Sequence, residues 1–171
     1  MDTFRAAVAR AVKDQNWYAA LVTTLTLPDI CGWLEAPTSG SRDRYQKWFD
    51  RFVAHRYTGR IGPSREQHVF LSGTDCYALR CAVLHEGVDS TERQRAKQAL
   101  TKFHFVAPRP GLVNHCNQFN NALQLQVDIF CTDVCSGVER WEAEVLNASS
   151  EVQSRTSELL RVHSLEKGFT M

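Results

Sequence analysis

The sequence has almost no excess of charge of either sign. Its 20 Lys and Arg residues nearly balance 19 Asp and Glu residues, for a formal net charge of +1. A strongly basic chain would indicate nucleic-acid binding over much of its surface. Any such role here must therefore depend on a local group of basic residues.

Long apolar runs and targeting patterns are also missing. The uncharged run over residues 15–28 is too short to cross a bilayer and contains Thr and Pro. The first residues, Met-Asp-Thr-Phe-Arg, lack the basic-then-apolar order of a signal peptide. We therefore expect a cytoplasmic protein with no membrane segment.

Several signatures of common enzyme classes are absent. The sequence has no phosphate-binding P-loop, no Gly-x-Ser-x-Gly, no His-Glu-x-x-His and no internal repeat. No two cysteines form a Cys-x-x-Cys pair, and in a cytosolic chain we expect free, buried thiols. The six are Cys31, Cys76, Cys81, Cys116, Cys131 and Cys135. A zinc site formed by Cys131, Cys135, His115 and Cys116 is an alternative, but its spacing matches no known zinc module. We expect no metal and no cofactor.

The sequence does contain enough apolar residues for one domain with a sizeable core. They make up 43% of the chain and include nine Phe and four Trp. Helical spacing of these residues predicts one helix over Asp2–Lys13 and a second that begins after the N-cap residue Asn16. Pro28 is expected to kink the second helix without ending it, because the apolar spacing continues to Leu34.

A third helix is predicted to begin with Ser41 as its N-cap, after which residues 57–63 form a loop. Alternating residues predict strands over 103–107 and 122–127, with 112–115 as a partner of the first. A long helix capped by Asp128 follows. The expected fold is mainly α, with a small antiparallel β element, in one domain over residues 1–148. Residues 149–171 are expected to be a helical or frayed tail.

The most informative segment is a predicted helix that runs from an N-cap at Ser72 to Gly87. Most of its surface is apolar, but Arg80 and His85 stand close to its end. On an ideal α-helix these two side chains are about 140° apart. They can meet at one ligand only if the last turn loosens or if a second chain completes the site.

The Arg-x4-His pattern of Arg80 and His85, followed by Glu-Gly, resembles the defining motif of the HEPN superfamily. The predicted helices over residues 17–32 and 41–52 are also similar to those that precede this motif in bacterial members. The resemblance covers residues 15–148. It implies an HEPN-like helical bundle in which two motifs meet across a homodimer. Many members cleave RNA without a metal, in toxin–antitoxin or defence systems, so RNA and an antitoxin are further expected partners.

The resemblance implies specific roles for the two motif residues. His85 would move a proton to or from the reacting oxygens, and Arg80 would bind the nonbridging phosphate oxygens. Arg56, Arg60 and Arg65 are candidate RNA-binding residues. They belong to a segment, residues 42–66, with seven Arg or Lys and three acidic residues. The product would carry a 2′,3′-cyclic phosphate.

Two other interpretations remain open. A solvated helix face followed by a basic loop would explain the same basic segment. Arg80 and His85 could also serve only to stabilise the carbonyl end of their helix. Cys81 follows Arg80 where active HEPN members often have a polar residue. The alternative function is therefore a non-catalytic HEPN module that binds protein, nucleotide or RNA through its dimer surface.

Overall fold

The computed structural model describes residues 1–94 and 99–162, and its fold is mainly α. The longer helices are α1 (Asp2–Lys13), α2 (Trp17–Glu35), α3 (Ser41–Phe52), α4 (Gly73–Cys81), α5 (Val127–Trp141) and α6 (Ser150–Arg155). Short 3₁₀ segments are η1 (Ala54–Tyr57) and η4 (Thr156–Glu158), and π-helical turns are η2 (Ala82–Glu86) and η3 (Glu142–Leu146). The strands are β1 (Thr58–Ile61), β2 (Glu66–Val69), β3 (Lys102–Val106), β4 (Asn117–Phe119) and β5 (Ala122–Gln126).

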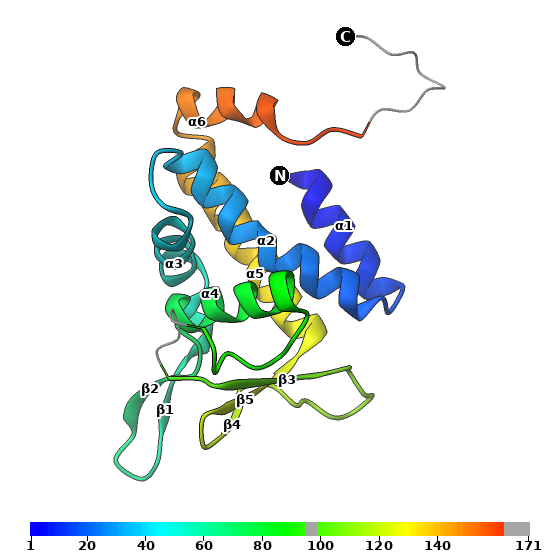
Figure 1. Cartoon of the computed structure of the whole chain (residues 1–171), viewed down its shortest axis with the longest axis vertical. Helices are drawn as coiled ribbons and strands as arrows, with labels where there is room; N and C mark the ends of the chain where they lie inside the picture. The colour runs from blue at the N-terminus through cyan, green and yellow to red at the C-terminus, as the bar shows by residue number, and fades with distance from the viewer. Residues whose placement is uncertain (95–98, 163–171) are drawn as a thin grey trace.

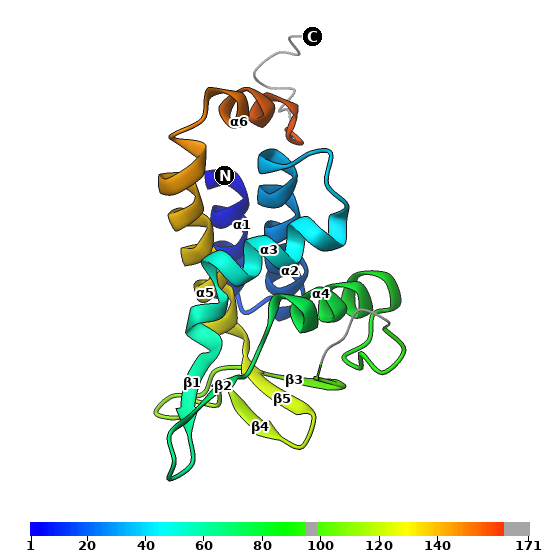
Figure 2. The same ribbon diagram turned by 90° about the vertical axis from the view of Figure 1, so that its left-hand side faces the viewer.

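The helices form a bundle around α2, and the strands lie at one end of it. α2 packs against α1, α3 and α5, while α4 lies between the bundle and the strands (Figure 1). α6 lies at the opposite end of the molecule from the strands, as the view turned by 90° also shows (Figure 2). α4 therefore contacts α3 on one side and stands close to the β structure on the other.

The central position of α2 follows from its sequence. Apolar residues surround this helix on several sides, so it is buried against three neighbours at once. Its N-terminus is capped as expected, since the Asn16 side chain accepts a hydrogen bond from Ala19 N at 3.2 Å. The helix continues through the buried Pro28 to Glu35, which confirms that the proline does not end it.

The third helix begins where the sequence predicts, but Ser41 does not cap it. The N-cap residue is Gly40, and the Ser41 hydroxyl donates to Asp29 on α2 instead. The apolar stripe of the helix is buried: Tyr45, Trp48, Phe49 and Phe52. The side chain of Ser41 is thus used for contact between helices, which the local sequence did not indicate.

The loop predicted for residues 57–63 is wrong, because most of it forms a β-hairpin. β1 pairs with β2 in an antiparallel register, with Gly59 opposite His68 and Arg60 opposite Gln67. Gly62 makes the turn with a φ of +69°, which a residue without Cβ adopts readily. The two strands are short and mostly polar, so the alternation that identifies a half-buried strand is absent.

The second β element is a mixed sheet, so the purely antiparallel arrangement expected here is wrong. The strand order is β3-β5-β4, with β5 parallel to β3 and antiparallel to β4. Residues 112–115 do not form the partner of β3; Leu112 makes only an isolated bridge with Arg109. Alternation reveals a strand but not the direction of its neighbour.

α5 begins two residues earlier than it would with Asp128 as its N-cap. Its N-cap residue is Gln126, whose side chain donates to Asp128 Oδ1 at 2.9 Å. The predicted tail contains α6, which places Val152 in the core and donates from Arg155 Nε to Leu34 O at 2.7 Å. Residues 163–171 of that tail lie outside the described part of the chain. None of the helices within the described ranges has the length and apolar character to span a membrane.

Candidate functional site

The end of α4 changes from α-helical to π-helical geometry before the chain leaves it. The Ser72 hydroxyl accepts from Asp75 N at 3.1 Å, which confirms the predicted N-cap. At the other end, Gly87 has a φ of +69° and donates to Ala82 O, five residues earlier. A π-helical turn places residues five positions apart on one face. The turn η2 therefore changes the angle that an ideal helix would put between Arg80 and His85.

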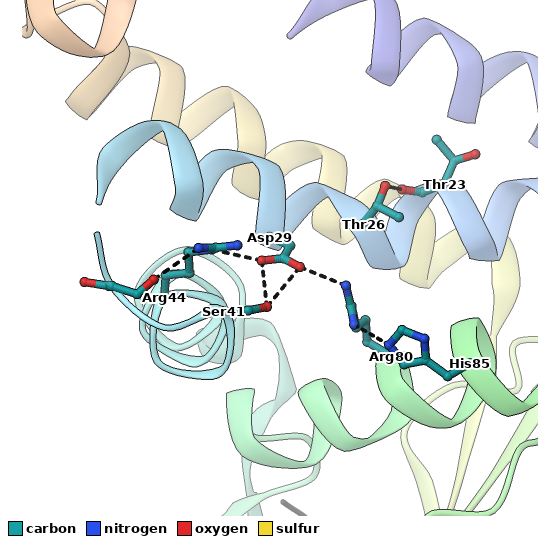
Figure 3. A network of polar contacts seen from close by, with 8 residues as sticks. Thr23, Thr26, Asp29, Ser41, Arg44, Arg80 and His85 are labelled. Carbon is teal, nitrogen blue, oxygen red and sulfur yellow. Dashed lines mark hydrogen bonds and ion pairs between the residues drawn. The ribbon is translucent and has the colours of Figure 1, made fainter. Parts of the chain in front are cut away.

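Arg80 and His85 consequently meet within one chain. Arg80 Nη1 lies 3.0 Å from His85 Nε2 (Figure 3). A guanidinium has only hydrogen-bond donors, so this contact uses the lone pair of Nε2. The loosening of the last turn, one of the two conditions set by the sequence, is fulfilled.

A carboxylate on α2 holds the other side of Arg80. Asp29 Oδ2 accepts from Arg80 Nη2 at 2.9 Å, and Asp29 Oδ1 accepts from Arg44 Nε at 3.0 Å (Figure 3). The Ser41 hydroxyl lies 3.1 and 3.2 Å from the two oxygens of Asp29. One carboxylate thus links α2, α3 and α4 and fixes the direction of the Arg80 side chain.

Burial differs sharply along this network. The side chains of Asp29 and Arg80 are 15% and 17% exposed, whereas His85 is exposed at the surface. A charge-assisted hydrogen bond is stronger where solvent is partly excluded. The network is therefore anchored inside the bundle, and its outer end presents an imidazole to solvent.

Two neighbours of the motif, Glu86 and Tyr77, have partners of their own. Glu86 Oε1 accepts from Gln94 Nε2 at 2.6 Å, so this carboxylate holds Gln94. Tyr77 packs edge-on against Tyr45, with ring centroids 5.5 Å apart. Partial burial raises the pKa of Tyr77, and the adjacent thiol of Cys81 adds to the effect. Tyr77 therefore stabilises the packing of α4 on α3.

The three candidate RNA-binding arginines lie at some distance in sequence and structure from this network. Arg60 is on β1 and Arg65 is at the hairpin turn, and both are exposed. The hairpin leads into the N-terminal end of α4, whereas Arg80 and His85 lie at its C-terminal end (Figure 1). The structure does not bring the motif and the hairpin arginines together in one chain.

Arg56 belongs to a second polar cluster, between η1 and α5. Arg56 Nη1 donates to Asp133 Oδ1 at 3.0 Å, and His115 Nε2 lies 3.9 Å from Asp133 Oδ2. Burial lowers the pKa of His115, although Asp133 opposes this shift. Burial also raises the pKa of Tyr57 well above its ordinary value, again with a contribution from Asp133. This cluster ties the start of the hairpin to α5.

Two of the four residues of the zinc alternative, Cys131 and Cys135, lie on α5. The Thr24 hydroxyl donates to Cys131 Sγ at 3.2 Å, and burial raises the pKa of Cys131 to about 11. Cys135 has a pKa of about 11 for the same reason. Within residues 1–94 and 99–162, no three His, Cys, Asp or Glu side chains are grouped as metal ligands.

Asp29, Arg44 and Ser41 were not identified from the sequence as site residues. A signal for Asp29 existed, because it is the only charged residue between Asp14 and Glu35. A lone carboxylate in a deeply buried helix needs a partner. Its partner Arg80 is 51 positions away, so the sequence alone did not identify the pair.

The protein was also compared with known families and structures. No protein-family model, no curated protein and no solved structure matches the chain.

Proposed function

We propose that the protein is a metal-independent endoribonuclease whose reacting groups are Arg80 and His85. The observation that supports this most directly is the 3.0 Å contact between Arg80 Nη1 and His85 Nε2 at an exposed helix end. It joins a group that can accept a proton to a group that can bind phosphate oxygens. Cleavage of RNA by its own 2′-hydroxyl requires both at one phosphate.

In this reaction the 2′-oxygen loses its proton to His85 Nε2 and forms a bond to phosphorus. The bond between phosphorus and the 5′-oxygen breaks, which gives a 2′,3′-cyclic phosphate and a 5′-hydroxyl end. Arg80 donates to the nonbridging oxygens, where negative charge increases in the transition state. Its Nη1 must then turn from Nε2 to the phosphate, so substrate binding itself frees the base.

One imidazole does not account for both proton transfers. The 5′-oxygen needs a proton as it leaves, and the network that the described residues form around Arg80 contains one histidine. We therefore propose that a homodimer brings two Arg80–His85 pairs to one phosphate. His85 is exposed, which leaves it accessible to a second copy of the chain.

Asp29 acts in this proposal as a positioning residue. It holds Nη2 of Arg80 and leaves the rest of the guanidinium directed toward His85 (Figure 3). Arg44 shares the carboxylate, so two positive charges surround one negative charge. The remaining positive charge favours an anionic ligand at the site.

The experiment compares wild type with His85→Ala on a mixed pool of RNA in EDTA, followed by analysis of the cleaved ends. We expect cyclic-phosphate ends with wild type and a loss of at least about 100-fold with His85→Ala. His55→Gln is the matched control, because His55 is an exposed histidine on η1, outside the network. This variant should cleave as wild type does.

Lack of cleavage by wild type on RNA of varied structure would contradict the proposal, as would equal loss with both histidine variants. Assembly is tested separately by light scattering. A monomer at all micromolar concentrations would rule out the composite site.

A non-catalytic binding module is the alternative function, and one observation favours it. Both terminal nitrogens of Arg80 already have partners, Asp29 and His85, so the phosphate-binding fork is engaged within the chain. Such a network can simply fasten α4 to α2. In that case His85→Ala would change the binding of RNA, nucleotide or protein at this surface, and wild type would leave RNA intact.

A further inference from the structure

The three-stranded sheet has one face in the core and one face open to solvent. Strand residues alternate between faces, and directly paired residues share a face. Phe103 pairs with Leu123, and both are fully buried. Gln118 of β4 pairs with Leu123 and so belongs to that inner face.

The open face is formed by alternate residues of the same strands, up to the pair Val106–Gln126, where Gln126 is buried. Its members are Lys102 and His104 on β3, Ala122 and Gln124 on β5, and Asn117 and Phe119 on β4. Lys102, His104 and Asn117 are exposed, and Phe119 is 81% exposed. Asn117 Nδ2 donates to Gln124 Oε1 at 2.9 Å, which aligns two amide groups across neighbouring strands. An aromatic ring, two amides and a cation therefore share one surface.

The strands of this sheet and their connections carry no acidic residue. Residues 99–127 contain no Asp or Glu, although the whole chain has 19 such residues. Lys102 and Arg109 are the basic residues of this segment. An anionic partner would therefore meet no carboxylate from these strands or their connections, and carboxylates would repel it.

The hairpin extends the same end of the molecule. His68 Nε2 lies 2.8 Å from Gln118 Oε1, so β2 is joined to β4 by a side-chain hydrogen bond. The hairpin carries Arg60 and Arg65 with only one acidic residue, Glu66. Together the hairpin and the sheet form a cationic end on a chain that is almost neutral overall.

We infer that the open face of the β3-β5-β4 sheet binds single-stranded RNA. Phe119 stacks on an unpaired base, Asn117 and Gln124 meet base edges, and Lys102 contacts the backbone phosphate. Unpaired bases commonly stack on exposed aromatic side chains, and their edges then become available for hydrogen bonds. The choice of RNA over DNA rests on the proposed function; the single-stranded character rests on Phe119 and the amides alone.

An apolar protein partner fits this face less well. Lys102, His104, Asn117 and Gln124 would lose water on contact with an apolar surface, and each would need a new hydrogen bond. Nucleotides provide both the acceptors and the aromatic faces that these side chains require. The composition of the open face therefore favours nucleic acid.

The test measures binding of a short, fluorescently labelled 2′-O-methyl RNA by anisotropy, so that cleavage cannot interfere. We expect the single strand to bind more tightly than the duplex of the same sequence. Phe119→Ala should weaken binding by at least about fivefold, and Phe119→Trp should retain it. Lys102→Gln should lower the slope of log affinity against log salt concentration by about 0.7. A single-stranded DNA of the same sequence shows whether the ribose contributes.

Tyr18→Ala is the matched control, because Tyr18 is an aromatic residue that is 86% exposed and belongs to α2, not to a strand of the sheet. It should bind as wild type does. Equal loss with Tyr18→Ala and Phe119→Ala, or no loss with Phe119→Ala, would overturn the inference. Because the probe cannot be cleaved, an inactive protein that still shows the Phe119 effect would contradict the proposed nuclease and leave the sheet surface established.

Discussion

The network of Arg80 and His85 and the open sheet face carry positive charge in opposite ways. In the network, a partly buried carboxylate holds each arginine in place: Asp29 serves both Arg44 and Arg80. On the sheet face the cation Lys102 is exposed, and residues 99–127 provide no carboxylate. Fixed geometry suits a chemical step, whereas exposed charge suits the capture of a flexible polyanion. A net charge of +1 conceals both arrangements.

The largest effect is expected from Asp29→Asn, which removes the charge that organises the network. Arg44 and Arg80 would then be close together with no carboxylate between them. The free energy of unfolding should fall by about 2–3 kcal/mol, less than for a fully buried pair because these side chains are 15–18% exposed. Urea unfolding measures this loss, and RNA cleavage should decrease with it.

The control for Asp29 is Asp43→Asn. Asp43 pairs with Lys47 at 2.8 Å, but both side chains are at least half exposed. Removal of such a pair should cost about 0.5 kcal/mol or less. If the two variants lose similar stability, Asp29 is no more important than an ordinary surface partner.

The next prediction compares a glycine of the motif helix with a glycine of the β1–β2 hairpin. A Cβ on Gly73 would lie 2.5 Å from Gln46 O and 2.8 Å from Asp50 Oδ1, so Gly73→Ala must push α4 from α3. We expect a loss of about 1–3 kcal/mol. Gly59→Ala in the hairpin would meet only Phe70 at 3.4 Å, an ordinary contact, and should change stability by about 0.5 kcal/mol or less. Thermal or urea unfolding separates the two.

Local signals in the sequence predicted the ends of the motif helix correctly. Ser72 caps α4 and Gly87 ends the π-helical turn, because caps depend on residues only a few positions away. The contact between Arg80 and Asp29 depends on how α4 crosses α2, which no local pattern encodes. For the same reason, alternation identified β3 and β5 but not their parallel pairing. Both the Arg80–Asp29 contact and the direction of β5 depend on packing between residues far apart in the sequence.

Two glycines with a positive φ can also be compared: Gly87 at the end of the motif helix and Gly62 in the hairpin turn. Gly87 and Gly62 both have a φ of +69° and open space around the Cβ position. Alanine at either position should cost about 1 kcal/mol in the free energy of unfolding. Only Gly87→Ala should also lower RNA cleavage, since it disturbs the turn that brings His85 to Arg80. Equal cleavage by both variants would show that the π-helical turn does not matter for activity.

The smallest expected effect is a pH dependence of stability that arises at the junction of β5 and α5, where His115 contacts the backbone. His115 Nδ1 accepts from Gln126 N at 3.2 Å, so protonation of this nitrogen would break a hydrogen bond at the end of β5. Burial lowers the pKa of His115 below its ordinary value of about 6.5, while Asp133 and Asp128 oppose the shift. The unfolded chain therefore binds the proton at a higher pH than the folded protein does.

Stability should consequently be full above about pH 6.5, decline as the pH falls from there, and level off below the pKa of the folded protein. Urea midpoints measured from about pH 8 to pH 5 test this. His115→Asn should flatten the decline, because the Asn oxygen can still accept from Gln126 N but cannot become charged. A decline of the same size in His115→Asn would assign the dependence to other groups. Among these is His55, whose pKa is lowered by burial and by Arg140 and Arg56, against the effect of Asp133.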